Sequence, residues 1–179
     1  MKLPLSRTLK QWLKQRTYDS KGWTFSDWRR DLFIAEYDEW LEYYLPLSVE
    51  GLTVLDVGAG EGETARFFLE QSAKKVICIE PDGDAFRLLS QNAIGRNIVC
   101  FNKKFDVSDL KMDFDFMKMD IEGYEEAMLN VQFTKPCVIE VHGLQLRDRF
   151  KELGYTFRGT GYQDAQGIVY GYNVKPIQK

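Results

Sequence analysis

The feature that most constrains the fold of this chain is a nine-residue stretch in its first half, residues 54–62, which reads VLDVGAGEG. An apolar run leads there into glycines at positions 58, 60 and 62, and residues 63–72 continue with a helical pattern. A strand, a glycine turn and a helix let a backbone approach a ligand closely, because glycine has no Cβ and tolerates positive φ. The dinucleotide fingerprint would place its third glycine at position 63, which is Glu63, so a nicotinamide- or flavin-dependent oxidoreductase is disfavoured.

Short apolar runs alternate with helical stretches from residue 53 to the C-terminus. This alternation predicts right-handed strand–helix–strand units and an α/β fold: a Rossmann-like, doubly wound, mostly parallel seven-stranded sheet with helices on both faces. The stretch 159–166 contains Gly, Gln and Asp, which predicts a hairpin and therefore an antiparallel C-terminal edge. We expect strands at 53–57, 75–79, 98–101, 114–119, 137–141, 155–158 and 167–174, and helices at 63–72, 84–94, 123–131 and 144–153.

Two helices are expected before the sheet begins. Apolar residues recur at helical spacing from residue 5 to about 18, and a second helix is expected from Thr24 or Ser26 to about Leu45, before Pro46 ends it. All four tryptophans lie in the first forty residues, where most of them are expected to fasten these helices to the body. We therefore expect an N-terminal helical arm at 1–50 and a single globular unit at 51–179.

The length and composition are those of one folded domain. The chain has 179 residues, of which 44% are hydrophobic and 28% charged, and no run approaches the roughly 20 apolar residues that cross a bilayer. The first seven residues lack the apolar region of a signal peptide, so a cytoplasmic location is expected. Cys78, Cys100 and Cys137 lie far apart without metal-ligand spacing, so we expect buried reduced thiols and no metal site.

The net charge of −3 is unevenly distributed. Residues 1–30 contain eight lysines and arginines and two aspartates, a charge of +6, which leaves −9 on the rest. A basic arm of this kind could grip nucleic acid or a membrane surface, or it could dock on its own acidic body or be solvated. Docking on the body or solvation is favoured over the other two alternatives. Nucleic acid is therefore a disfavoured partner, but it is not excluded.

In an open parallel sheet, ligands bind beyond the carboxyl ends of the strands, and these ends are mostly acidic here. Glu80 lies 18 residues after Gly62 at the end of the neighbouring strand, where a carboxylate can accept hydrogen bonds from both hydroxyls of a ribose. A Gly-Lys-Ser/Thr phosphate loop is absent, and clustered carboxylates would repel phosphates. A cationic nucleoside is therefore favoured, and S-adenosylmethionine fits. The five strand ends are at Asp56, 80–82, 106–109, 120–123 and 140–143.

Several segments, in this order, resemble motifs of known methyltransferases. Residues 54–62, 79–81 (IEP) and 106–110 (DVSDL) resemble the first three motifs of class I S-adenosylmethionine-dependent methyltransferases. Residues 117–125 (MKMDIEGYE) resemble the signature of the FkbM-type methyltransferases, and 139–143 (IEVHG) is similar to the strand that follows it in that family. The resemblance covers residues 52–143 and implies a methyltransferase that uses S-adenosyl-L-methionine.

The resemblance also implies how the matching residues bind the cofactor. The glycine turn would lie under the methionine part, with Asp56 orienting the turn or reaching the ammonium, and Glu80 would hold the ribose hydroxyls. Asp106 and the backbone of Val107 would meet the edge and face of the adenine. The cofactor-binding residues implied in this way are Asp56, Gly58, Ala59, Gly60, Gly62, Glu80, Pro81, Asp106, Val107 and Asp120.

Methyl transfer from a sulfonium is an in-line displacement, so holding the acceptor in line can supply much of the catalysis, of the order of 7–11 kcal/mol. We expect Asp120 near the transferred methyl group, with Glu122 in support, because the two side chains diverge along the backbone. His142, the only histidine, could take a proton from an attacking hydroxyl or could simply be hydrogen-bonded at the end of its strand. Lys118 is expected to point away from the cofactor.

Three functions are carried forward. The first is O-methylation of a small molecule or a saccharide, a substrate class that the resemblance implies. The second is a non-catalytic module that binds S-adenosylmethionine, and the third is an RNA methyltransferase whose residues 1–30 dock the nucleic acid. Amino-group methylation of bases is disfavoured, because residues 120–123 replace the Asn/Asp-Pro-Pro-aromatic motif. The two N-terminal helices are expected to pack over or beside the mouth of the cofactor site as a lid.

Overall fold

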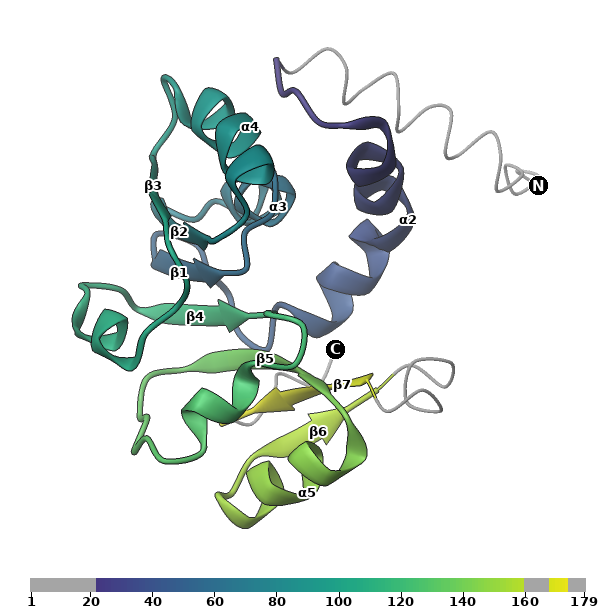
Figure 1. The fold of residues 1–179 in the computed structure, drawn as a ribbon, viewed down its shortest axis with the longest axis vertical. Coiled ribbons are helices and arrows are strands. Elements are labelled where there is room, and N and C mark those ends of the chain that lie inside the picture. The colour runs from purple at the N-terminus through teal and green to yellow at the C-terminus, as the bar shows by residue number, and fades with distance from the viewer. Residues whose placement is uncertain (1–21, 160–167, 174–179) are drawn as a thin grey trace.

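The chain is built around a seven-stranded sheet in which five parallel strands are followed by an antiparallel pair (Figure 1). The computed structural model describes residues 22–159 and 168–173. The strands are β1 (Thr53–Val57), β2 (Lys75–Glu80), β3 (Ile98–Asn102), β4 (Phe116–Met119), β5 (Cys137–His142), β6 (Thr156–Arg158) and β7 (Ile168–Tyr172). They lie in the order β3-β2-β1-β4-β5-β7-β6, with β7 antiparallel to both of its neighbours. The predicted α/β fold with an antiparallel C-terminal edge is confirmed.

Helices cover both faces of this sheet. They are α2 (Asp27–Tyr43), α3 (Glu63–Glu70), α4 (Gly83–Ala93), α5 (Leu144–Glu152) and two 3-10 turns, η1 (Val107–Lys111) and η2 (Glu125–Met128). One face packs against α2, α3 and α4, and the other against α5 and the 3-10 turns. Successive side chains of a strand point to opposite faces of a sheet. Val54 of β1 therefore packs on the face that carries α2, α3 and α4, and Leu55 packs on the face that carries α5.

The segment after β4 differs from its prediction. The sequence predicts a helix at 123–131, but the chain forms only η2, a 3-10 turn of four residues. Glu122 and Gly123 both adopt left-handed backbone angles, with φ of 54° and 99°. The chain therefore turns sharply at the end of β4, which an α-helix beginning at residue 123 would not allow. The predicted helix is wrong, and a compact loop takes its place.

The second of the two predicted N-terminal helices is present as α2, whose bounds fall within the predicted range. The first predicted helix, at 5–18, and most of the predicted hairpin turn at 159–166 lie outside the described residues. In the described part of the chain, no helix has both the length and the apolar character needed to cross a bilayer.

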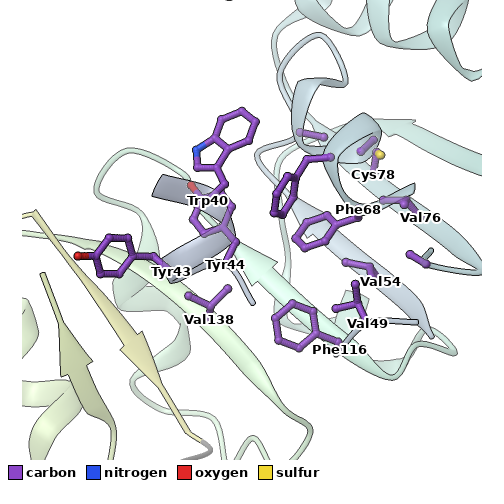
Figure 2. Packing of buried hydrophobic residues seen from close by; sticks show 14 of the residues in the cluster. Trp40, Tyr43, Tyr44, Val49, Val54, Phe68, Val76, Cys78, Phe116 and Val138 are labelled. Atoms are coloured by element: carbon purple, nitrogen blue, oxygen red, sulfur yellow. The ribbon is translucent and has the colours of Figure 1, made fainter. Parts of the chain in front are cut away.

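Aromatic side chains of α2 and of the residue that follows it join the core on one face of the sheet. Trp40 stacks on Tyr44 with 5.7 Å between ring centroids, and it meets Phe67 of α3 edge-on at the same distance. Figure 2 shows Trp40, Tyr43 and Tyr44 in the same cluster as Phe68 and the apolar residues of the central strands. Truncating a buried aromatic side chain of this kind to alanine typically costs about 3–5 kcal/mol. Helix α2 is therefore held by the same core as the sheet.

The three cysteines are free thiols, as predicted. Cys78 and Cys137 are buried, whereas Cys100 is half-buried. Burial raises the pKa of Cys137 to about 12, so this thiol stays protonated and unreactive at neutral pH.

Candidate functional site

The glycine turn after β1 is packed against the segment that follows β4. Gly58 has a φ of 78°, and a Cβ atom at this position would lie 1.7 Å from the carbonyl oxygen of Asp120. Only glycine is compatible with both the backbone angle and this close approach. The Gly58 N–H also donates to the carbonyl of Ile79 at 2.9 Å, which joins the turn to β2. Two motifs that are far apart in the sequence therefore meet at one place.

Glu80, the last residue of β2, is held by the backbone of this turn. Its Oε2 accepts a hydrogen bond from the Gly60 N–H and its Oε1 accepts one from the Asp82 N–H, both at 2.8 Å. The turn itself is closed by a 2.9 Å hydrogen bond from the Gly62 N–H to the carbonyl of Ala59. Burial raises the pKa of Glu80, and the two backbone hydrogen bonds oppose this rise. A carboxylate has about four lone-pair sites, so both oxygens can still accept hydroxyl groups.

A mostly apolar pocket of about 280 Å³ opens at the carboxyl edge of β1 and β2. It adjoins Glu80, because the residues before and after Glu80 both line it. Apolar walls with few polar groups suit a planar heteroaromatic ring such as adenine. The lining residues are Val57, Gly58, Ile79, Pro81, Lys104, Phe105, Ile121 and Tyr124.

Asp106 and Val107, to which the resemblance gives the adenine, are not among the residues that line this pocket; Lys104 and Phe105 line it instead. The carboxylate of Asp106 accepts a hydrogen bond from the Ser108 N–H in a capping box that begins η1. The hydrogen bonds from Ser108 lower the pKa of Asp106. The adenine contacts of Asp106 and Val107 therefore stay predictions, whereas their positions at η1 are established.

Lys118 lies beneath the glycine turn and does not line the apolar pocket, so the expectation that it points away from the cofactor stays a prediction. Its Nζ donates to the carbonyl of Gly58 at 2.9 Å and lies 3.3 Å from Asp56 Oδ1 and 3.9 Å from Asp120 Oδ2. Burial disfavours the charge, but the neighbouring carboxylates, Asp56 first, raise the pKa of Lys118. Asp56 is fully buried and also accepts a 2.6 Å hydrogen bond from the Thr64 hydroxyl. With these contacts to Lys118 and Thr64, Asp56 orients the glycine turn.

A second group of ionisable side chains, the β4–β5 corner, consists of Asp120, Glu140 and His142. Their ligand atoms lie within 4.8 Å of one another. This spacing would admit a metal ion, but Lys118 already supplies a positive charge 3.9 Å from Asp120, and we assign no metal to the corner. The Tyr44 hydroxyl donates to Glu140 Oε2 at 2.7 Å. Burial and then the charge of Asp120 raise the pKa of Glu140 to about 8.

His142 is surrounded by carboxylates. Its Nδ1 lies 3.0 Å from Glu125 Oε1, and its Nε2 lies 3.6 Å from Glu122 Oε2 and 3.9 Å from Glu140 Oε1. Burial lowers the pKa of His142, but the hydrogen bond with Glu125 and its charge raise it more, to about 9. The Glu122 side chain is 86% exposed, whereas Glu125 is fully buried. The sequence pattern gives Glu125 no role, although it is the last residue of the segment MKMDIEGYE.

A second hollow, of about 590 Å³, also includes His142 and is more open to solvent. Loop 121–126 contributes residues to this hollow and to the apolar pocket, so the two are neighbours along that loop. Its volume is in the range that holds a small molecule or a sugar unit. The lining residues are Gly123, Glu126, His142, Gly143, Leu144, Gln145, Leu146 and Arg149.

The start of α2 is fastened to the glycine turn. Ser26 donates to the Glu61 carboxylate through its backbone N–H and its hydroxyl. Arg29 forms an ion pair with Glu63 at 2.7 Å. Glu61 and Glu63 both belong to the segment between β1 and the first turn of α3, so the helix and the turn are joined by charged and polar contacts.

Farther along, α2 approaches the β4–β5 corner. Burial and the charges of Glu39 and Asp120 raise the pKa of Glu36 to about 7, and a hydrogen bond with Trp40 opposes the rise. Tyr44, directly after the helix, reaches Glu140 of the corner. The helix therefore contacts both parts of the candidate site, and a role as a lid stays a prediction.

The sheet order, the glycine turn after β1 and the acidic end of β2 together define the class I S-adenosylmethionine-dependent methyltransferase fold. Fibrillarin from Aeropyrum pernix, solved with bound S-adenosyl-L-methionine, is 15% identical, with 72% of this chain and 69% of that chain covered and a TM-score of 0.56. The ribosomal protein L11 methylase from Lactobacillus delbrueckii subsp. bulgaricus is 16% identical, with coverages of 79% and 76% and a TM-score of 0.52. An S-adenosylmethionine-dependent methyltransferase from Mesorhizobium loti is 12% identical, with coverages of 77% and 96% and a TM-score of 0.53.

No family model matches the sequence, and no curated protein matches it. At 12–16% identity, the likeness to these solved structures establishes the fold and leaves the activity to be argued from the site. The resemblance of residues 117–125 to the FkbM-type signature is therefore a hypothesis about the family.

Proposed function

We propose that the protein is an S-adenosylmethionine-dependent methyltransferase of the FkbM type, which methylates a hydroxyl group of a small molecule or a saccharide. The observation that carries the proposal is the geometry at Glu80. Its carboxylate is fixed by the Gly60 N–H directly beside an apolar pocket. A carboxylate beside an apolar pocket suits an adenosine. Its ribose offers two neighbouring hydroxyls to the carboxylate, and its flat, largely apolar adenine fits the pocket.

The remaining part of the cofactor would extend from this pocket along the glycine turn toward the β4–β5 corner. The turn, oriented by Asp56, would support the methionine part, and Asp120 would favour its ammonium. One oxygen of Asp120, Oδ1, is buried and has no hydrogen-bond partner among the described residues. A buried carboxylate oxygen without a partner destabilises the protein. A cationic ligand that binds this oxygen would remove that cost.

Methyl transfer would form a bond between the acceptor oxygen and the methyl carbon while the carbon–sulfur bond breaks and its electron pair goes to sulfur. The hydroxyl proton must leave the acceptor during this step. We assign the position beside the methyl group to Asp120, with Glu122 in support, and the hydroxyl proton to His142. The hollow beside His142 would hold the rest of the acceptor.

Calorimetric titration with S-adenosylhomocysteine tests the first half of this proposal. We expect the full chain to bind it, and we expect Glu80→Gln to weaken binding about tenfold or more, because a hydrogen bond to a charged group contributes about 1.5–3 kcal/mol. Asp84→Asn is the matched control, since Asp84 is exposed on the next helix and makes no contact with the pocket. Absence of binding by the unchanged chain at millimolar ligand would contradict the proposal.

Two alternatives are separated from the enzyme by further measurements. Cofactor binding without methylation of any hydroxyl acceptor in a broad panel would favour a non-catalytic binding module. An RNA methyltransferase would need the basic segment 1–30 to be available for phosphates. The two arginines of that segment that the structure describes are both in ion pairs, Arg29 with Glu63 and Arg30 with Asp27 and Asp31. Retardation of labelled RNA at low salt would nevertheless favour this third function.

A further inference from the structure

Glu125 is a buried carboxylate that binds three groups at once. Its side chain has no exposed surface, and its Oε1 lies 3.0 Å from the Gly123 N–H nitrogen and 3.3 Å from that of Ile121. The same oxygen lies 3.0 Å from Nδ1 of His142. Two of these groups belong to the loop after β4, and the third ends β5. Glu125 therefore joins the two strand ends that form the β4–β5 corner.

The contact with Glu125 decides which nitrogen of His142 faces the corner. An ionised carboxylate only accepts hydrogen bonds, so Nδ1 must carry the proton that it donates to Glu125. Nε2 is then the nitrogen whose lone pair is available in the neutral ring. Nε2 is the ring atom that lies near Glu122 and Glu140, at 3.6 and 3.9 Å.

Glu125 is ionised under the conditions where this arrangement matters. Burial alone would raise its pKa, but the hydrogen bonds with His142 and Gly123 lower it below the ordinary value. Its other oxygen, Oε2, is buried and has no hydrogen-bond partner among the described residues. The imidazole is thus the cationic group that balances this carboxylate.

We propose that Glu125 is a positioning residue, which fixes the ring orientation, tautomer and charge of His142 so that Nε2 meets the proton of the acceptor hydroxyl. The proposal rests on the proposed function for the last clause only. In the transfer step, the O–H bond breaks, Nε2 takes the proton, the oxygen takes the methyl carbon, and the carbon–sulfur pair stays on sulfur. Glu125 keeps its charge throughout and stabilises the imidazolium that results.

The charge state of His142 depends on every ionisable group that faces it. Glu125 of η2, Glu122 of the loop and Glu140 of β5 are within 4 Å of its ring nitrogens, and Asp120 adds its charge from the end of β4. These carboxylates favour the imidazolium in the free protein. A bound sulfonium would bring a positive charge beside Asp120 and so lower the pKa of His142 toward neutral pH.

Nuclear magnetic resonance of His142 tests the proposal without any need for turnover, because this is the only histidine of the chain. The ring is expected to titrate near pH 9 in the unchanged protein and to hold its proton on Nδ1 when neutral. In Glu125→Gln, the amide oxygen can accept the same hydrogen bonds, so the tautomer is kept and the pKa falls by about one unit or more. In Glu125→Ala, the tautomer preference is lost as well.

Glu126→Gln is the matched control for the titration, because it removes the same charge from the next residue, which makes no hydrogen bond or ion pair with His142 in the described part of the chain. It is expected to shift the pKa of His142 by less than a third as much as Glu125→Gln. Equal shifts in the two variants, or an unchanged pKa and tautomer in a folded Glu125→Ala variant, would overturn the proposal.

Kinetics separate this proposal from the proposed function. In an active enzyme, the rising limb of kcat against pH is expected to move to lower pH in Glu125→Gln. The shift should equal the fall in the pKa of His142 in the cofactor complex, and KM for S-adenosylmethionine should be unchanged. A loss of kcat that is uniform over pH would show a merely structural role. If the unchanged chain neither binds S-adenosylhomocysteine nor methylates, the proposed function fails, and the titration still decides whether Glu125 sets the state of His142.

Discussion

The two ends of the candidate site hold their carboxylates in opposite ways. At the β1–β2 end, both oxygens of Glu80 accept hydrogen bonds from backbone N–H groups. At the β4–β5 end, Asp120 Oδ1 and Glu125 Oε2 are buried without a hydrogen-bond partner in the part of the chain that the structure describes. The pKa of Glu140 is raised to about 8 by burial and by the charge of Asp120. Glu80 therefore has hydrogen bonds to both oxygens without a ligand, whereas Asp120 and Glu125 do not.

The difference follows from where the partners come from. Glu80 receives its N–H groups from the backbone, one from Gly60 of the glycine turn and one from Asp82, two residues after Glu80. The β4–β5 corner depends on side chains from separate elements: Lys118 of β4, Tyr44 after α2, and Glu125 of η2. Leaving a buried polar atom unpaired costs about 1–3 kcal/mol. We therefore expect the β1–β2 end to bind its ligand with little change, and the β4–β5 end to be stabilised by a cationic ligand.

The largest effect is expected where the two ends touch, at Gly58. In Gly58→Ala, the new Cβ would overlap the carbonyl of Asp120 and the backbone would be strained, so the free energy of unfolding should fall by about 4 kcal/mol or more. Gly123→Ala is the control: its φ of 99° is also unfavourable, but no heavy atom lies within 4 Å of the added Cβ. Its cost should be only about 1–3 kcal/mol. Urea unfolding measures both, and equal losses would contradict the contact between the ends.

Removing the buried ammonium beneath the turn should have the next largest effect. Lys118→Met leaves Asp56 buried without its cationic partner, and we expect a loss of about 3 kcal/mol in the free energy of unfolding. Asp56→Asn combined with Lys118→Met removes both charges, so the double variant should be more stable than the sum of the two single losses predicts. Strict additivity of the losses in a double-mutant cycle would show that the two charges do not interact.

The β1–β2 end could be predicted from the sequence because its determinants are contiguous. The glycines follow an apolar strand, and Glu80 ends the next strand, so the alternation of strands and helices is sufficient to bring them together. The same alternation predicts the parallel sheet, and the Gly, Gln and Asp residues of the stretch 159–166 predict its antiparallel edge. Burial on both faces makes these strands near-continuous apolar runs, which are easy to recognise.

The β4–β5 corner could be predicted only in part. Asp120 and His142 were recognisable as strand ends, but the partner of Glu140 is Tyr44, on a segment far from it in the sequence. The direction of Lys118 depends on which residue of β4 pairs with Asp56, and a period of two residues leaves that register open. The helix expected at 123–131 failed because nothing in the composition of the segment reveals the positive φ of Glu122.

A smaller effect is expected in the apolar pocket, where the structure and the resemblance point to different residues. Tyr124 lines the pocket but is 54% exposed, so Tyr124→Ala should leave stability unchanged while it weakens S-adenosylhomocysteine binding about fivefold through lost ring contact. Val107→Ala, at a side chain that is 41% exposed and does not line the pocket, should weaken it less than twofold. Calorimetry of the two variants compares the two assignments. A larger loss of S-adenosylhomocysteine affinity in Val107→Ala than in Tyr124→Ala would favour an adenine site beside η1.

The smallest effect concerns the charge that α2 adds to the β4–β5 end. The pKa of Glu36 is about 7 in the folded protein, against an ordinary value of 4.5, because of burial and then the charges of Glu39 and Asp120. Between these pH values the folded state binds more protons than the unfolded state, so the stability that this group contributes is present below pH 4.5 and is lost as the pH rises through 7.

After allowance for solvent screening of a partly exposed group, Glu36→Gln should be more stable than the unchanged chain at pH 8 by about 1 kcal/mol. Near pH 4.5 the two proteins should have similar thermal midpoints, and Glu42→Gln, at an exposed position of the same helix, should show no such pH-dependent gain. An equal gain at both pH values would mean that Glu36 does not share the electrostatics of the corner, and that α2 is only a packing element there.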